Sequence, residues 1–469
     1  MERFIKISLY GVVFGFVLVL SSFFNLCSAQ SVLTDAELKA KYQNNNIKIL
    51  IVPGHDGESQ TGTYFKGIYE RDLNLQLADD LYNLLENDGH FSVFITRDKN
   101  GYLPIFENYF KDQATSTRLF IEKYKQITDS AIANGTFKVQ TDGIDHPVVA
   151  NDYALRLYGT NKWADENNID IVINIHFDDY PGRSADQVGV YSGFSIYAPE
   201  SQLVNSEISQ SVAKSVSVEL SKVQSSSDYQ PEHTSVVDDQ DLIAIGANST
   251  LNAAAILVEY GYIYESQIIN KNIRSVIFPE YAYKTYLGVV KFLDDNFKVN
   301  GYDSALLPYK FSNNLYFGMR NNSEVAKLQE MLNYEGFYSG PITGNFLHDT
   351  QQAVIDLQKN NTADISVASG YVGPQTVKLL NKKEIESFSY VWNDDLYYGM
   401  KNNADVRALQ EILSLEGFYN GPITGNFLNL TRQSVITCQK KSKFSSNPGT
   451  GYVGPLTRGA LNNLYSVSQ

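Results

Sequence analysis

The feature of this 469-residue sequence that most limits its possible folds is an internal duplication. Residues 315–322 recur as residues 396–403, so Met319 and Met400 occupy the same place in two copies, an offset of 81 residues (400 − 319). The same offset relates three further stretches, 335–338 to 416–419, 340–346 to 421–427 and 370–374 to 451–455. Because no insertion separates the copies, the sequence predicts two duplicated modules, residues 311–382 and residues 392–465.

Each module is predicted to open with an amphipathic helix. In the first copy Val325, Leu328 and Leu332 fall at positions i, i+3 and i+7, which places them on one helical face. Asn322 is a suitable N-cap, and Gly336 suits the left-handed position just past the helix end. These signals predict a helix that is bounded at both ends.

Two further helices complete each predicted module. The second runs through residues 350–357, and a short third one follows Pro374, which gives a small all-α unit of three helices. Cys438 stands where the first copy has Leu357. We therefore interpret this cysteine as a small hydrophobic core residue.

The preceding segment, residues 45–297, alternates apolar strand-like runs with helical patterns. Such alternation is typical of an α/β domain. Residues 99–151 form a long polar and aromatic stretch that predicts an inserted helical subdomain, and residues 298–310 predict a linker. The predicted strands are 47–52, 91–96, 169–176, 193–197 and 253–260.

The N-terminus carries an export signal. A charged start is followed by an apolar run over residues 7–24 and by Cys27, Ser28 and Ala29, so residues 1–29 predict a signal peptide cut after Ala29. An uncleaved membrane anchor is the alternative, because about 18 apolar residues can span a bilayer. A lipoprotein linked through Cys27 is a weaker interpretation. Removal of the leader would leave one cysteine and therefore no intramolecular disulfide.

Composition excludes two classes of protein. The chain is 43% hydrophobic and 19% charged, which is not the composition of a disordered protein. The formal net charge of −14 argues against a nucleic-acid partner, because such binding needs Lys and Arg to neutralise phosphates. We expect a folded, acidic protein with no nucleic-acid partner.

Three residues at the ends of predicted elements form a candidate metal site. His55 follows the strand 47–52 in a glycine-rich turn, and His176 closes the strand 169–176. Glu70 opens a helix whose predicted apolar face is Leu73, Leu77, Leu81 and Leu84. Two imidazoles and a carboxylate on three separate elements match the ligand set of a catalytic zinc, which leaves a fourth position for water. Taken alone, His55 could be a turn residue and Glu70 a favourable charge at a helix N-terminus.

Glu259 is a carboxylate inside what otherwise predicts a fully buried strand. An unpaired buried charge costs several kcal/mol, so Glu259 requires a metal, a proton or a cation as its partner. A buried salt bridge to an arginine such as Arg156 is the alternative interpretation. The remaining histidines, His90, His146, His233 and His348, lie in polar surroundings and are expected at the surface, with His233 the one candidate for an auxiliary site group.

The upstream segment resembles the zinc-dependent N-acetylmuramoyl-L-alanine amidases of the cell-wall hydrolase type. The resemblance rests on residues 53–55, Glu70, the pair 96–97, residues 174–176 and residues 257–263, which follow one another in the family's order. It implies a mixed sheet flanked by helices, one Zn²⁺ bound by three ligands, and a catalytic acid/base. The implied ligands are His55, Glu70 and His176, and the implied acid/base is Glu259.

The duplicated modules resemble peptidoglycan-binding domains, with spacers or protein-interaction units as the alternative. Together the resemblances imply a secreted or wall-associated enzyme that hydrolyses the amide between N-acetylmuramic acid and L-alanine in peptidoglycan. Two other functions stay open, a zinc peptidase acting on stem peptides and a non-catalytic wall-binding scaffold. The sequence assigns no substrate-binding residues.

Overall fold

The computed structural model describes residues 32–56, 62–141, 143–144, 146, 150–180, 182–184, 186–295, 297, 306–401, 403–421, 423–441 and 449–466. The predicted signal peptide, residues 1–29, and most of the predicted linker lie outside these ranges. Among the described residues, no helix combines the length and the apolarity needed to cross a membrane.

A six-stranded mixed sheet forms the centre of the first domain. The first four strands of the sheet run parallel, β8 is antiparallel to β10, and β9 is parallel to β8. The predicted α/β class is therefore confirmed. The order across the sheet is β4 (Phe91–Ile95), β1 (Ile47–Pro53), β7 (Ile171–Asp178), β10 (Ala254–Tyr262), β8 (Ser195–Pro199) and β9 (Val236–Asp239).

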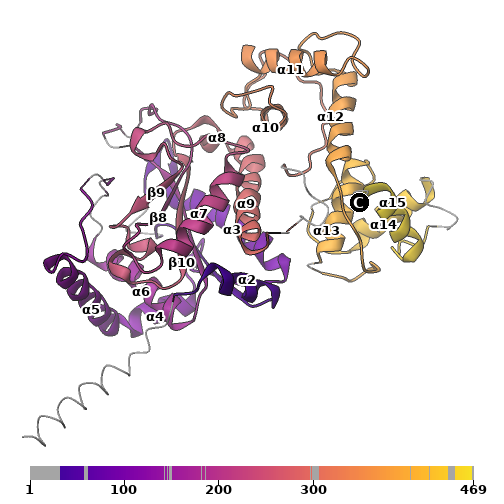
Figure 1. The fold of residues 1–469 in the computed structure, drawn as a ribbon. Helices are drawn as coiled ribbons and strands as arrows, with labels where there is room; N and C mark the ends of the chain where they lie inside the picture. Colours follow the sequence, from indigo (N-terminus) through magenta and orange to yellow (C-terminus); the bar gives the residue numbers. More distant parts are fainter. Residues whose placement is uncertain are drawn as a thin grey trace, which may run out of the picture.

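Helices cover both faces of the sheet, and the alternation of side chains along each strand explains why. In β1, Ile49 and Ile51 face one side and join the core under α3, α7 and α9, whereas Leu50 and Val52 face the other side. Strands that are buried on both faces read as continuous apolar runs, as the sequence of β1 does. The first layer consists of α2 (Asp35–Gln43), α3 (Glu70–Asp88), α7 (Ser206–Leu220) and α9 (Lys271–Leu293), labelled in Figure 1.

The second face is covered by α4 (Pro104–Asp112) and α6 (Asn151–Glu166). Phe106 of α4 and Trp163 of α6 pack 4.6 Å apart, ring centroid to ring centroid, in the core on this face. Helix α5 (Ala114–Ala133) lies outside them and buries only Thr117. Helices α4 and α5 both fall within the stretch that the sequence marks as an insertion.

Short elements join these layers. They are β2 (Tyr64–Phe65), β3 (Ile68–Tyr69), β5 (Arg97–Asp98), β6 (Gly101–Tyr102), η1 (Gln230–Glu232), η2 (Ile243–Ile245), η3 (Ala247–Ser249) and α8 (Ser266–Ile269). Four of them form two hairpins, β2 with β3 and β5 with β6. Both hairpins lie near the carboxyl ends of parallel strands, because β2 and β3 come after β1 in the chain, and β5 and β6 come after β4.

The C-terminal part consists of two three-helix units, as the duplication predicts. Asn322 caps the first helix by accepting a hydrogen bond from the Val325 N–H, and Gly336 has φ +78° after its end. The third helix of the first unit is not short, because it extends over 14 residues. The helices are α10 (Ser323–Tyr334), α11 (His348–Asn360) and α12 (Pro374–Ser387), then α13 (Ala404–Leu415), α14 (Asn429–Lys441) and α15 (Pro455–Tyr465).

The two units differ in how they pack. The core of the first unit is continuous with the core of the sheet domain, where α10 lies against α9. The second unit has a core of its own, in which Cys438 is buried, as predicted. The first unit is thus attached to the sheet domain by side-chain packing as well as by the chain.

Candidate active site and metal centre

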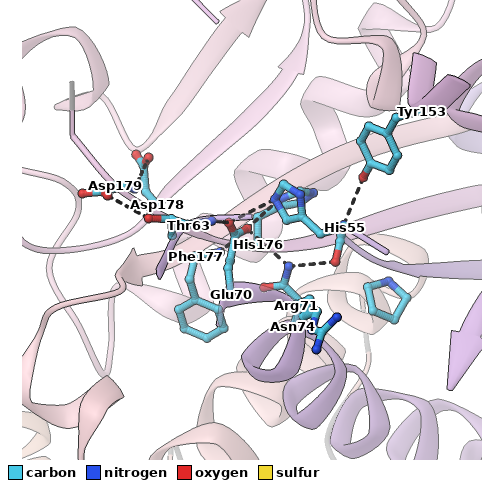
Figure 2. Close-up of polar contacts among 12 residues, drawn as sticks. His55, Thr63, Glu70, Arg71, Asn74, Tyr153, His176, Phe177, Asp178 and Asp179 are labelled. Carbon is cyan, nitrogen blue, oxygen red and sulfur yellow. Dashed lines mark hydrogen bonds and ion pairs between the residues drawn. The ribbon is translucent and has the colours of Figure 1, made fainter. Parts of the chain in front are cut away.

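The side chains of His55, Glu70 and His176 converge at the carboxyl edge of the sheet. His55 Nε2 lies 3.0 Å from Glu70 Oε2, and His176 Nδ1 lies 2.9 Å from Glu70 Oε1. Figure 2 shows both imidazoles pointing toward this one carboxylate. The three groups offer ligand atoms that all lie within 4.8 Å of one another, so the structure brings together the three residues that the sequence singles out.

The turn after β1 presents His55 in an unusual backbone conformation. His55 has φ +64°, a region in which non-glycine residues are uncommon and which costs of order 1 kcal/mol or more. The turn is held by two hydrogen bonds, from His55 N–H to the Tyr153 hydroxyl (3.0 Å) and from Gly54 N–H to the Ile175 carbonyl (2.9 Å). Strain that the surroundings hold in place at a polar site is a recurrent feature of functional residues.

Glu70 is the first residue of α3 and is buried. Its carboxylate accepts hydrogen bonds from the N–H groups of Thr63 (2.9 Å) and Phe177 (3.3 Å) and from the Asn74 side chain (3.3 Å). Position at the helix start lets the side chain reach back to the sheet edge, as the sequence predicts. The carboxylate is therefore fixed by neighbours on three sides before any ligand arrives.

Arg97, which sequence comparison singled out only as part of a motif, lies beneath the site. Its buried guanidinium donates to the carbonyls of Pro53 (3.0 Å), Gly54 (2.8 Å) and Arg71 (2.8 Å). It thereby links the turn that carries His55 to the first turn of α3, which carries Glu70. Burial lowers the pKa of Arg97 from its usual value.

The electrostatics of the three candidate ligands are mutually dependent. Burial by itself would raise the pKa of Glu70, but the two imidazoles hold it well below its usual value. Burial by itself would lower the pKa of His55, but the neighbouring Glu70 raises it. Burial lowers the pKa of His176, and the hydrogen bond to Glu70 does not fully offset it. The site thus stabilises an ionised carboxylate between two imidazoles, which is the state that binds a cation.

Glu259 lies beside His176 on the neighbouring strand. The two residues are paired in the parallel register of β10 and β7, and Glu259 is the one residue of β10 that is not fully buried. Its Oε2 atom is buried without a hydrogen-bond partner among the described residues. Burial, followed by the charges of Asp178 and Glu70, raises the pKa of Glu259 well above its usual value.

The alternative partner for Glu259 pairs elsewhere. Arg156 donates to Asp56 at 2.7 Å, and among the described residues no ion pair joins Arg156 to Glu259. The interpretation of Glu259 as half of a structural salt bridge to Arg156 is therefore wrong. A bulge follows at Gly261, where φ is +138°, and bulges next to active sites re-aim side chains.

A buried polar network adjoins Glu259. Glu232 of η1 accepts hydrogen bonds from the hydroxyls of Tyr197 (2.7 Å) and Tyr262 (2.9 Å) and hydrogen-bonds Asp178. Burial, followed by the neighbouring Glu232, raises the pKa of Asp178 well above its usual value. No sequence pattern marks Glu232 apart from its place next to His233, which is itself exposed and lies against the Gln230 carbonyl.

The other histidines take no part in the site. His90 stacks on Tyr42 with ring centroids 4.4 Å apart, and His348 lies beside Phe317. His146, expected at the surface, is instead half-buried, because its Nε2 atom pairs with Asp239 Oδ2 at 2.6 Å. That contact ties the end of the inserted stretch to β9.

The donor set fits a zinc ion. Two imidazoles, which bind metals in their neutral form, and an ionised carboxylate are ligands that Zn²⁺ prefers in catalytic sites. Glu259 adds a second carboxylate beside these three residues. Its buried Oε2 atom has no hydrogen-bond partner in the part of the chain that the structure describes. The fold and the site together place a candidate metal centre at the carboxyl edge of a mixed sheet.

The family follows from comparison with known proteins. Residues 49–276 match the family described as "N-acetylmuramoyl-L-alanine amidase", and residues 321–380 and 402–461 each match the family described as "Putative peptidoglycan binding domain". The chain therefore carries an N-acetylmuramoyl-L-alanine amidase domain, followed by two peptidoglycan-binding domains. The resemblance predicted from the sequence is confirmed.

Individual relatives are similar over part of their length. A 99-residue stretch is 29% identical to the N-acetylmuramoyl-L-alanine amidase AmiC of Escherichia coli O6:H1, covering 21% of this chain and 24% of that protein. The CwlD amidase of Clostridioides difficile, solved with the GerS lipoprotein, aligns with 54% of this chain and 100% of its own at 18% identity and a TM-score of 0.36. The Ami1 amidase of Mycobacterium smegmatis aligns with 53% of this chain and 98% of its own at 14% identity and a TM-score of 0.35.

Proposed function

We propose that this chain hydrolyses the amide bond between N-acetylmuramic acid and L-alanine in peptidoglycan. The observation that carries the proposal is the pairing of Glu259 with His176 in the sheet register, which puts a carboxyl group of raised pKa beside the His55, Glu70 and His176 cluster. A general base and an electrophile on adjacent strands are what amide hydrolysis requires. The match of residues 49–276 to the amidase family supports the same reaction.

In this proposal His55, Glu70 and His176 hold a single zinc ion. When bound, zinc supplies a Lewis acid that polarises the scissile carbonyl and lowers the pKa of water. Glu70 is already ionised between the two imidazoles, so the chain offers the metal a preformed anionic ligand. Asn74 and the Thr63 N–H fix the orientation of that carboxylate.

Glu259 moves the proton. As a carboxylate it removes a proton from the attacking water, and as a carboxylic acid it returns that proton to the leaving nitrogen of L-alanine. Burial and the neighbouring carboxylates raise its pKa, which favours the protonated form that the second role requires. The neighbouring carboxylates Asp178 and Glu70 add to the effect of burial in raising the pKa of Glu259.

Replacement of Glu259 by Gln tests the assignment. We expect the variant Glu259→Gln to lose at least about 10³-fold in turnover of muropeptides, because general acid–base catalysis typically contributes 10²–10⁴-fold. Zinc content, measured by elemental analysis of the purified protein, should stay at one per chain. The matched control is His233→Ala, an exposed residue near the network, which should keep full activity. A Glu259→Gln enzyme as active as the wild type would refute the assignment.

The products separate this function from its alternatives. Mass spectrometry of digested peptidoglycan should find intact stem peptides that begin with L-alanine. Shortened stem peptides would instead indicate a zinc peptidase, and an unchanged polymer would indicate a scaffold. Treatment with a chelator should abolish the release of stem peptides, and added Zn²⁺ should restore it.

The two C-terminal domains then act as anchors outside the cytoplasm, on the cell wall. Both match a peptidoglycan-binding family, and binding to an insoluble polymer raises the effective concentration of the amidase domain at its substrate. Deletion of residues after Ser387 should therefore weaken retention on sacculi and leave the cleavage of soluble muropeptides intact.

A further inference from the structure

Both C-terminal domains expose the same three aromatic side chains. Tyr316, Phe317 and Tyr371 in the first domain correspond to Tyr397, Tyr398 and Tyr452 in the second, each pair separated by the repeat offset of 81 residues. All six side chains are between 41% and 56% exposed. We call the two sets the aromatic patches. Large aromatic residues that stay exposed at equivalent places in two copies call for an explanation.

The local backbone places two residues of each patch opposite each other. Leu315 and Val372 form an antiparallel bridge and are both fully buried. Since successive side chains of an extended chain point to opposite sides, Tyr316 and Tyr371 lie opposite each other on the outer side. Phe317 extends the patch and is supported by the His348 ring, with centroids 4.7 Å apart.

The second domain repeats this arrangement. Leu396 and Val453 form the equivalent bridge and are fully buried, which puts Tyr397 and Tyr452 on the outer side. The Tyr452 hydroxyl donates to Asp395, and Tyr397 lies close enough to Tyr452 to affect its pKa. Tyr398 holds the position of Phe317.

The turns that carry the patches are held in the same way in both domains. The N–H of Tyr316 donates to the Met319 sulfur at 3.3 Å, and the N–H of Tyr397 donates to the Met400 sulfur at 3.3 Å. Gly318 and Gly399 follow with φ of +96° and +100°. A backbone fixed in this way keeps the rings in place before binding, which lowers the entropy that a ligand must overcome.

We propose that each aromatic patch binds the glycan strand of peptidoglycan by stacking on the faces of its sugar rings. This inference rests on the proposed function, because it names the part of the wall polymer that the anchors recognise. A pyranose ring presents C–H groups on its face and hydroxyls at its edge, which suits the electron-rich face of an aromatic ring flanked by tyrosine hydroxyls. Two equal patches in one chain suit a ligand whose own units repeat.

Charge favours the glycan over the peptide as the bound part. The chain has a net charge of −14, so long-range attraction does not draw it to the carboxylates of stem peptides. None of the six patch residues carries a formal charge. Binding through the patches should therefore change little between about 0.05 and 0.5 M salt, whereas ionic contacts would be screened over that range.

Co-sedimentation measures the inference directly. The full-length Glu259→Gln chain is mixed with insoluble sacculi and with sacculi whose stem peptides have been removed, so that the second probe contains glycan alone. We expect Tyr316→Ala/Tyr371→Ala or Tyr397→Ala/Tyr452→Ala to weaken binding to both probes about 10-fold, and the quadruple variant to lose binding by a larger factor, because the two sites act together. The matched control is Tyr334→Ala, an exposed tyrosine of the first domain outside the patch.

Three results would overturn the inference. The first is a quadruple variant that binds both probes as tightly as the unsubstituted protein. The second is an unsubstituted protein that binds intact sacculi but not the glycan probe. The third is a quadruple variant that still binds glycan and has instead lost self-association of the chain. Circular dichroism checks that the variants are folded, which their exposed positions favour. Cleavage of soluble muropeptides by the same variants in the active background tests the proposed function separately. The patches can fail while the amidase activity stands, and glycan binding can be measured even if no cleavage occurs.

Discussion

Two glycines, which have no side chain, make room for the side chains of the candidate ligands. A Cβ added to Gly54 would come within 2.1 Å of the His176 ring, and one added to Gly62 would come within 2.3 Å of a Glu70 carboxylate oxygen. Contacts this short do not occur in folded proteins, so the ring and the carboxylate occupy positions that only glycine permits. The glycines of the turn after β1 thus belong to the site as much as the histidines do.

Substitution of Gly54 should therefore weaken metal binding. We expect Gly54→Ala to displace the His176 ring and to lower zinc affinity about 10–100-fold, the range typical when the support of a ligand is lost. Competition with a chromophoric chelator measures the affinity. Gly459→Ala is the control, because nothing lies near an added Cβ there and the residue is helical. Equal zinc affinity in the two variants would contradict the prediction.

Glu265 should make stability depend on pH. It accepts hydrogen bonds from the N–H groups of Tyr262 (2.8 Å) and Gly193 (3.2 Å), but burial raises its pKa from 4.5 to about 7. Because the raised pKa favours the protonated form, its contribution is full below pH 4.5 and is lost as the pH rises to about 7. The loss is on the order of 3 kcal/mol.

The measurement compares wild type with Glu265→Gln, which keeps the shape of a neutral side chain. Relative to that variant, the wild-type melting temperature should fall between pH 5 and pH 8. A constant difference between the two proteins across this range would show that Glu265 does not titrate there.

Residue patterns predicted the candidate ligands but not the network behind Glu259. His55, Glu70 and His176 stand at the ends of elements, and strand ends in one sheet meet at one edge, so their types and positions were sufficient. Glu232 lies on a 3-10 turn of three residues, and only the tertiary fold brings it to Tyr197 and Asp178. No periodicity marks such a residue. The same reason explains His146, whose partner Asp239 is 93 residues away.

At the scale of elements, the small β5–β6 hairpin supports the site from below. Its Arg97 satisfies carbonyls of the β1 turn and of α3, so a two-residue strand fixes the relative position of two larger elements. Element positions were largely predictable here, because apolar runs and caps mark them. The buried face of α3 was predicted less accurately. The sequence predicted Leu84 on this face, but Leu84 is only partly buried and Leu85 is fully buried instead.

Replacement of Arg97 by Met should loosen this support. We expect Arg97→Met to lower the free energy of unfolding by about 2–4 kcal/mol, because three carbonyls lose a charged donor in a buried position. Zinc affinity should fall in the same variant, as the turn with His55 and the helix with Glu70 separate. Denaturant unfolding and a zinc titration measure the two effects. Arg118→Met on the exposed side of α5 is the control and should alter neither.

At the scale of the whole molecule, a buried group of charges joins the amidase domain to the first peptidoglycan-binding domain. Lys327 of α10 lies 2.9 Å from Glu280 of α9 and 2.7 Å from Glu330, and Lys284 lies 3.4 Å from Glu280. Burial raises the pKa of nearby Glu384 to about 8. Glu280 also accepts a hydrogen bond from the Leu307 N–H at 2.9 Å. It therefore contacts both α10, through Lys327, and the segment that precedes α10.

The duplication shows that this contact is particular to the first domain. The position of Lys327 is taken by Ala408 in the second domain, whose core is separate. The exchange of Lys327 for Ala408 is thus one of the differences between the domain that packs on the amidase domain and the one that has a core of its own. Sequence comparison of the copies reveals the exchange, but only the structure shows that Glu280 is its partner, because Glu280 lies in another domain.

Lys327→Ala, which introduces the residue of the second copy, should uncouple the two domains. Removal of one partner from a buried ion group typically costs about 3–5 kcal/mol, because Glu280 would stay buried without its nearest cation. We expect calorimetry to show the first peptidoglycan-binding domain melting apart from the amidase domain, whereas in the wild type these two domains should melt together because they share one core. The control is Lys383→Ala, since Lys383 forms a half-exposed pair with Glu335 at 3.0 Å within one domain. If Lys327→Ala melts as the wild type does, packing of α10 on α9 holds the domains together without the charges.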